Sequence, residues 1–256
     1  MSIATETHDD TLLIRIDAPE RRNALDLERL TGLAHTLREA DTDPAVHTIV
    51  LTGADPSFCA GLDLKAIGSG ELNLAAVQAD GAGDPWRALQ EITTPTVAAV
   101  NGAAVTGGLE LVLGCDLAIA SEHAVFADTH ARVGIHPSGG MTVLLPRYVG
   151  LRDALGMSLT GRFVPADEAR LMGLVNAVVP HEDLIDDALV WARSITEADP
   201  EMLAAVRATY RALDGLPLDA AHAREREIGT SLAVDANAIE GRRTEVIQRG
   251  RGLQGS

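Results

Sequence analysis

The sequence has few cysteines and few positively charged residues. Its two cysteines, Cys59 and Cys115, are too few for a disulfide framework and favour a reducing compartment. Its 21 lysines and arginines stand against 37 aspartates and glutamates, and the net charge of −16 argues against a nucleic-acid or anionic-membrane partner. A local basic pocket for a phosphorylated ligand is compatible with that charge. Residues 5–10 are polar and acidic, unlike a signal peptide, so we expect a cytoplasmic protein.

The sequence also has no uninterrupted apolar segment of membrane-spanning length. Residues 96–120 are numerous enough to cross a bilayer, but they include Asn101, Glu110, Asp116 and four glycines. They therefore predict a buried part of a globular core, in keeping with a chain that is 46% hydrophobic. No zinc-ligand, P-loop or dinucleotide-binding pattern occurs. We accordingly expect neither a metal nor a nucleotide cofactor.

Residues 96–120 place one carboxylate among apolar side chains. The β-branched run at 97–100 predicts a buried strand, and Gly107-Gly108 begins a second apolar segment that surrounds Glu110. The first N–H groups of a helix have no intrahelical acceptor, and a carboxylate one turn later could move a proton beside them. Two interpretations stay open. Glu110 is catalytic, or it caps its own helix or pairs with an arginine.

Hydrophobic periodicity predicts strands and helices in alternation, followed by a helical C-terminal part. Expected strands at 11–16 and 47–52 flank an amphipathic helix at 26–40, an order typical of parallel sheets. Residues 57–65 predict a turn that leads into a short helix, and residues 68–84 predict a mobile, partly helical segment beside the site. Further strands are expected at 116–120, 123–126 and 174–179. Further helices are expected at 86–92, 141–149, 152–159, 165–172, 184–195, 201–212, 218–234 and 236–249.

Taken in order, the motifs resemble those of the crotonase, or enoyl-CoA hydratase/isomerase, superfamily. The resemblance is carried by RNAL at 22–25, FCAGLDLK at 58–65, VNG at 100–102, GGLEL at 107–111, CDLAIA at 115–120, FA at 126–127, GIHP at 134–137 and LTG at 159–161. It implies an α/β fold in which residues 1–195 form a spiral of ββα units with a CoA-thioester site. It also implies a C-terminal helical part, residues 196–256, that is used in trimer formation.

The resemblance further implies the residues of the site. The N–H groups of Leu62 and Gly107 would form an oxyanion hole for the thioester carbonyl oxygen. Arg249 and Arg251 would be candidates for contact with the CoA phosphates of a neighbouring subunit. Coenzyme A would be part of the substrate, so no separate cofactor is expected. Contacts to the substrate or CoA would come from Arg22, Ala24, Ala60, Leu62, Asp63, Leu64, Lys65 and Gly108.

One position departs from the family pattern. Hydratases of this family hold a water between two carboxylates, and Glu110 matches the first of them. Alignment from Phe126 places His130 at the second. An imidazole, with an ordinary pKa of about 6.5, can donate or accept a proton near neutral pH, so a Glu110–His130 pair could hydrate a double bond. Alternatively, His130 makes a hydrogen bond within the fold or lines the acyl pocket, and Asp128 is the nearest other carboxylate.

These observations predict an enoyl-CoA hydratase with Glu110 and His130 as its catalytic residues. Three alternatives stay open: a double-bond isomerase of the same fold, a thioester hydrolase or decarboxylase that uses the same oxyanion hole, and an acyl-CoA-binding protein with little catalysis. The apolar positions of the helical C-terminal part need a partner surface, which together with the resemblance predicts a homotrimer or a dimer of trimers. No nucleic-acid or membrane partner is expected.

Overall fold

The computed structural model describes residues 2–232, 239, 241–243 and 246–247. The chain divides into two compact units, Met1–Leu203 and Ala204–Ser256. The described strands all belong to the first unit, and the described residues of the second are mainly helical. The predicted division after residue 195 stays a prediction. No helix among the described residues is both long enough and apolar enough to cross a membrane.

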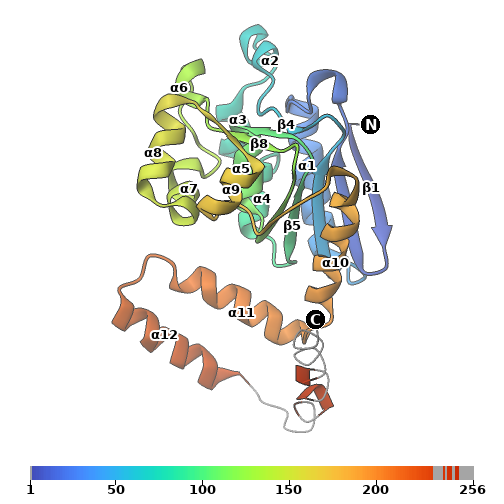
Figure 1. Ribbon diagram of the computed structural model, residues 1–256, viewed down its shortest axis with the longest axis vertical. Helices are drawn as coiled ribbons and strands as arrows, with labels where there is room; N and C mark the ends of the chain where they lie inside the picture. Colours follow the sequence, from blue (N-terminus) through green and yellow to red (C-terminus); the bar gives the residue numbers. More distant parts are fainter. Residues whose placement is uncertain (1, 233–238, 240, 244–245, 248–256) are drawn as a thin grey trace. The chain divides into compact units, whose positions relative to one another are not determined.

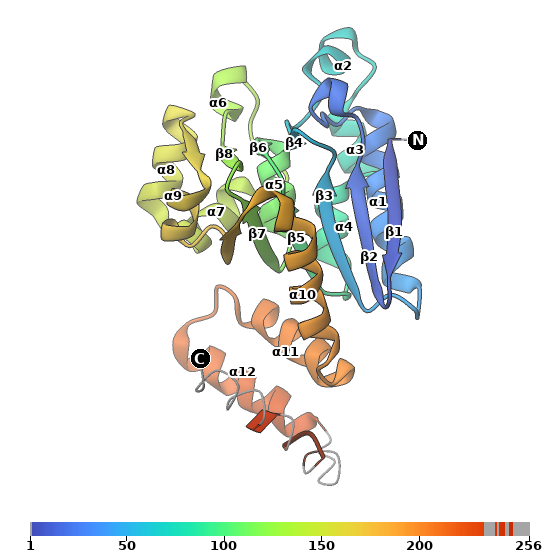
Figure 2. The same ribbon diagram turned by 45° about the vertical axis from the view of Figure 1, so that its right-hand side comes forward.

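Six strands form the larger sheet, in the order β1-β2-β3-β5-β7-β10 (Figure 2). β1 runs antiparallel to β2, and the other neighbours are parallel. Every residue of β3 and β5 is buried, as expected of central strands that are covered on both faces. Their bounds are β1 (Ile3–His8), β2 (Thr11–Ile16), β3 (Thr48–Gly53), β5 (Thr96–Val100), β7 (Leu117–Ser121) and β10 (Ala177–Val179).

Four short strands form a second sheet, in the order β4-β6-β8-β9. β4, β6 and β8 are parallel to one another, whereas β9 is antiparallel to β8. The sequence predicted a turn where β4 lies and no strand at β6 or β9, because three residues are too few to establish a periodicity. The bounds are β4 (Ser57–Cys59), β6 (Ala103–Val105), β8 (Val125–Ala127) and β9 (Phe163–Pro165).

The chain winds as a spiral in which each turn supplies one strand to each sheet and then a helix. The three turns are β3–β4–α2, β5–β6–α5 and β7–β8–α6. Their helices are α2 (Leu64–Ser69), α5 (Gly107–Gly114) and α6 (His130–Val133). The predicted spiral of ββα units is therefore confirmed.

Helices cover both faces of the larger sheet (Figures 1 and 2). Because side chains alternate along a strand, Leu13 packs in the cluster with α10, whereas Ile14 packs in the cluster with α1, α4 and α5. The helices of the first unit, besides the three named above, are α1 (Leu27–Thr42), α3 (Leu74–Asp80), α4 (Pro85–Glu91), α7 (Met141–Val149), α8 (Leu151–Thr160), α9 (Ala166–Met172) and α10 (Leu184–Thr196).

The helical part that follows α10 contains α11 (Pro200–Leu213) and α12 (Leu218–Ser231), close to the helices expected there. The helix expected at 236–249 lies largely outside the described residues. Two short 3-10 helices complete the described chain, η1 (Pro19–Arg21) and η2 (His181–Asp183). α3 confirms that residues 68–84 are partly helical.

Candidate active site

The parallel pairing of β4, β6 and β8 brings three distant segments to one sheet edge. Cys59 is paired with Ala104, and Ala104 with Phe126, so the residues that follow these strands leave the sheet side by side. The segment after β4 carries Leu62, the segment after β6 begins α5, and the segment after β8 begins α6. The spiral itself therefore assembles the candidate site.

Among the residues that the structure describes, the N–H groups of Leu62 and Gly107 at this edge have no hydrogen-bond partner. The Leu25 amide binds the Gly61 carbonyl oxygen at 2.7 Å, and the Asp63 amide binds the Leu25 carbonyl oxygen at 2.9 Å. These two bonds form a parallel bridge that uses the Gly61 carbonyl and the Asp63 amide. The Leu62 N–H, which lies between them, takes no part in the bridge. Gly107 is the first residue of α5, so its N–H has no intrahelical acceptor.

The Leu62 and Gly107 segments are in close contact. A Cβ on Gly61 would lie 3.2 Å from the Gly107 nitrogen and 2.0 Å from Thr106 Oγ1, and Gly61 has a φ of +89°, so glycine is required there. Thr106 precedes α5 with φ 50° and ψ −115°. A β-branched residue with these backbone angles is strained by about 1–3 kcal/mol, and such strain concentrates at functional sites.

Glu110 lies one turn into α5 and is 3% exposed. One oxygen, Oε1, accepts hydrogen bonds from the amides of Gly139 at 2.8 Å and Met141 at 3.1 Å. A Cβ on Gly139 would lie 2.7 Å from Glu110 Oε2, so this amide can approach only as glycine. Burial raises the pKa of Glu110, and the opposing effects of the two amides and of His130 do not cancel it. The Glu110 carboxylate is therefore held by amides of the loop before α7, and not by capping of its own helix or by pairing with an arginine.

His130 faces Glu110 from the first position of α6. Its Nε2 lies 3.8 Å from Glu110 Oε2, and its side chain is almost completely buried. Its Nδ1 lies 2.7 Å from Asp128 Oδ1. The structure thus brings together the two predicted catalytic residues and adds Asp128 behind the histidine. The sequence signal for Asp128 was its place two residues before His130.

A cavity of about 70 Å³ is lined by Leu62 and His130, whereas Gly107 and Glu110 are not among its lining residues. Its wall combines apolar residues with Thr106, Thr129 and His130. Leu62 lines it, which agrees with an N–H group at the position expected for the oxyanion hole. The lining residues are Ala60, Leu62, Leu64, Thr106, Thr129, His130, Val133 and Ile135.

The other predicted contact residues divide into two groups. Arg22, Ala24, Ala60, Leu64 and Lys65 are exposed or half-buried around the first donor segment. In contrast, Asp63 and Gly108 are buried, and a Cβ on Gly108 would lie 2.0 Å from the Cys59 carbonyl oxygen.

The Asp63 carboxylate accepts from the amides of Lys65 and Ala66 at the start of α2 and pairs with Arg21 at 2.6 Å. Burial opposes ionisation of Asp63, but these bonds lower its pKa. Arg249 and Arg251 lie outside the described residues.

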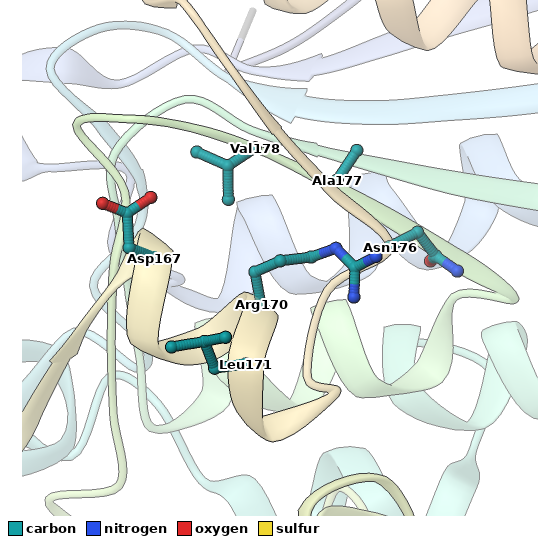
Figure 3. Close-up of a pocket in the computed structure, with 6 residues that line it drawn as sticks. All are labelled: Asp167, Arg170, Leu171, Asn176, Ala177 and Val178. Atoms are coloured by element: carbon teal, nitrogen blue, oxygen red, sulfur yellow. The ribbon is translucent and has the colours of Figure 1, made fainter.

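A second, larger hollow of about 530 Å³ lies between α9 and β10 (Figure 3). It contains none of the predicted site residues. Its lining comes from Asp167, Arg170 and Leu171 of α9 and from Asn176, Ala177 and Val178. Across the described part of the chain, no group of three or more His, Cys, Asp or Glu side chains could hold a metal ion.

Two contacts of the site join segments that are far apart in the chain. The Trp86 indole N–H, from α4, donates to the carbonyl oxygen of Gly107 at 2.9 Å and so fixes the start of α5. The amides of Gly139 and Met141 meet Glu110 across about thirty positions of chain. Neither pairing could be predicted from local spacing, because both depend on how α4 and the loop before α7 pack against α5.

Comparison with known proteins places this geometry in a family. The enoyl-CoA hydratase/isomerase family profile matches residues 6–245. Enoyl-CoA hydratase EchA19 of Mycobacterium tuberculosis is 33% identical over 97% of this chain and 95% of its own.

Two solved structures are similar. That of EchA16_2, an enoyl-CoA hydratase of Mycobacterium paratuberculosis, is 40% identical, with a TM-score of 0.76 over 90% of this chain and 98% of its own. An enoyl-CoA hydratase subunit of Geobacillus kaustophilus gives a TM-score of 0.86 at 29% identity, over 97% of this chain and 96% of its own. The chain is therefore an enzyme of the enoyl-CoA hydratase/isomerase family, as its motifs predicted.

Proposed function

We propose that the enzyme is an enoyl-CoA hydratase that adds water reversibly across the double bond of trans-2-enoyl-CoA thioesters. The observation that carries this proposal is the meeting of two pairs of groups. The Leu62 and Gly107 segments are in contact, and their N–H groups have no partner among the described residues, while Glu110 faces His130, which lines the same small cavity as Leu62. The relatives are named as hydratases, which agrees with this chemistry.

In the proposed reaction the thioester carbonyl oxygen accepts hydrogen bonds from the N–H groups of Leu62 and Gly107. Ionised Glu110 takes a proton from water while the water oxygen attacks Cβ, and the π electrons move to the carbonyl oxygen as an enolate. The two fixed donors and the N-terminus of α5 stabilise that charge where it develops. Nε2 of protonated His130 then delivers a proton to Cα. Coenzyme A is part of the substrate, and no separate cofactor takes part.

A product assay tests the reaction type. The purified protein is incubated with short-, medium- and long-chain trans-2-enoyl-CoAs, and the products are identified by mass. We expect 3-hydroxyacyl-CoA, which is heavier than the substrate by one water. A product of unchanged mass would indicate an isomerase, release of free CoA would indicate a thioester hydrolase, and binding without turnover would indicate a binding protein. Each of these outcomes would contradict the proposal.

We also propose that the enzyme assembles as a homotrimer or a dimer of trimers. Neither α11 nor α12 has a buried residue, although α11 is amphipathic. Met202, Val206 and Tyr210 recur every fourth residue on one face of α11 and are exposed. Such an apolar stripe needs a covering surface.

Sedimentation equilibrium at micromolar concentration should therefore give three or six times the mass of one chain. Val206→Glu, which puts a charge into the stripe, should weaken the assembly. Ala208→Glu, on the opposite face of α11, is the matched control and should leave the mass unaltered. A monomeric parent protein would contradict the prediction.

The cytoplasmic location expected from the sequence remains part of the proposal. Both cysteines are buried and neither forms a disulfide within the described part of the chain, which agrees with a reducing compartment. Burial raises the pKa of the Cys59 thiol to about 12, so this residue acts as a small apolar side chain beside the first donor segment.

A further inference from the structure

A single oxygen atom fixes both the backbone and the ring of His130. Oδ1 of Asp128 accepts a hydrogen bond from the His130 amide at 3.2 Å and lies 2.7 Å from the ring nitrogen Nδ1. A carboxylate bonded to the N–H two residues later is a local turn that aspartate favours. It places His130 at the first position of α6 and sets the direction of its ring.

The state of Asp128 decides which nitrogen of His130 carries hydrogen. Burial opposes ionisation of this carboxyl group, but hydrogen bonds from the His130 ring, the Ser158 side chain and the His130 amide outweigh it and lower the pKa of Asp128. An ionised carboxylate only accepts hydrogen bonds, so Nδ1 must be the donor. Nε2 is then the nitrogen that faces Glu110.

A protonated His130 also needs negative charge close to its ring. Among the described residues, the ionisable groups paired with its ring are Glu110, from α5, and Asp128, before α6, while the uncharged Ser158 of α8, which packs on α6, bonds to Asp128. The hydration mechanism needs Glu110 ionised and His130 protonated at the same time. A buried cation is costly unless it is paired, and the pair with Glu110 is lost whenever Glu110 gains a proton. Asp128 supplies a negative charge that persists through the cycle.

We propose that Asp128 is a positioning residue for His130, holding hydrogen on Nδ1 so that Nε2 serves the substrate, and stabilising the imidazolium beside ionised Glu110. This inference rests on the proposed hydratase function. In each turnover the water O–H bond breaks and Glu110 gains that proton, while His130 loses its Nε2 proton to the new C–H bond. The proton on Glu110 then returns to Nε2 across the 3.8 Å gap, which one bridging water can span.

The decisive variant is Asp128→Asn, which keeps the shape and one accepting oxygen but removes the charge. Its kcat should fall about 10–100-fold, the loss found for carboxylates that orient metal-binding histidines. KM should change little, because Asp128 lies behind His130. Loss of a nearby negative charge disfavours the imidazolium, so the limb on which activity falls with rising pH should move to lower pH. Asp116→Asn is the matched control: Asp116 binds the Thr96 amide within the sheet, and its loss should not move that limb.

A measurement on the parent protein tests the inference without turnover. In protein labelled with ¹⁵N-histidine, the neutral His130 ring should carry hydrogen on Nδ1 and a bare Nε2, with His130→Gln used to assign the signal among the eight histidines. Hydrogen on Nε2 in the neutral ring, or an Asp128→Asn enzyme whose pH limb stays in place, would overturn the proposal. Because the NMR signature does not depend on enoyl-CoA, an inactive parent with hydrogen on Nδ1 would contradict the hydratase function and leave the positioning role supported.

Discussion

Replacing Glu110 by glutamine should lower kcat by about 10²–10⁴-fold, the contribution of a positioned general acid or base. Glutamine keeps an oxygen that can accept from the Gly139 and Met141 amides, so the loop stays in place while the base is removed. His130→Ala should cost a similar factor. The double variant should lose far less than the product of the two, because residues that act as a unit are not additive.

The pH profile of the parent enzyme belongs to the same prediction. Glu110 must be ionised to take a proton, so activity should fall as the pH drops through its pKa. Burial raises that pKa, and the acidic limb should therefore lie above the ordinary value of about 4.3 for a glutamate. In Glu110→Gln this limb should vanish. The control is Glu122→Gln, an exposed carboxylate outside the site, which should preserve both rate and profile.

Substitutions of His130 distinguish a hydratase from an isomerase. A hydratase that needs both residues should lose most of its activity in His130→Ala, whereas an isomerase that relies on Glu110 alone should keep much of it. His130→Glu restores two carboxylates, and should keep hydration active while moving the alkaline limb. If His130→Ala hydrates as fast as the parent with an unaltered pH profile, the two-residue mechanism is wrong.

Gly107→Pro deletes one of the two proposed oxyanion donors and should lower kcat by about 10²–10³-fold, the cost of one such donor in a well-studied protease. Proline is compatible with the first position of a helix, but it also restricts the backbone of the preceding Thr106, whose ψ is −115°. The assay is single-turnover hydration, with the melting curve measured in parallel.

Gly107→Ala is the matched control, because it adds a Cβ that meets the Trp86 ring at 2.9 Å, as proline does, yet keeps the N–H. Leu62→Met keeps the other donor and should retain most of kcat. Equal damage from the alanine and proline variants would assign the loss to packing against Trp86. Severe damage from Leu62→Met would mean that Leu62 acts through its side chain and that the hole lies elsewhere.

Strands and helices with a clear hydrophobic periodicity were predictable from the sequence. β2 and α7 match the expected bounds, and α1 begins where Asp26 caps it by accepting from the Arg29 amide. β1 was not predicted, because its residues are mostly polar and exposed on an edge strand. β4 and β6 were missed for a different reason. Each has three residues, and the pairing between them, which spans a whole turn of the spiral, determines their structure.

Site residues that lie in the family motifs were predictable from the sequence. Contacts between segments that are distant in the chain were less predictable. The chemistry of Glu110 could be argued from its apolar neighbours, but the amides that bind it come from the loop before α7. A strand was expected at 123–126 and no helix directly after it, whereas β8 spans Val125–Ala127 and His130 begins α6. Asp128 Oδ1, which accepts from the His130 amide at the start of α6, also lies within reach of the ring nitrogen Nδ1.

The location of the cavity wall has a consequence for how such an enzyme diversifies. Leu64, 50% exposed, and Val133, 42% exposed, border the cavity from two short helices at the rim. Glu110 and His130, in contrast, are 3% and 6% exposed and packed into the spiral. Substitutions at an exposed rim usually alter stability by no more than about 0.5 kcal/mol, whereas changes in the core cost several times more. In the proposed hydratase, the residues that border this cavity can therefore change among descendants of this chain under weak constraint, while Glu110 and His130 are held fixed by the requirement to fold.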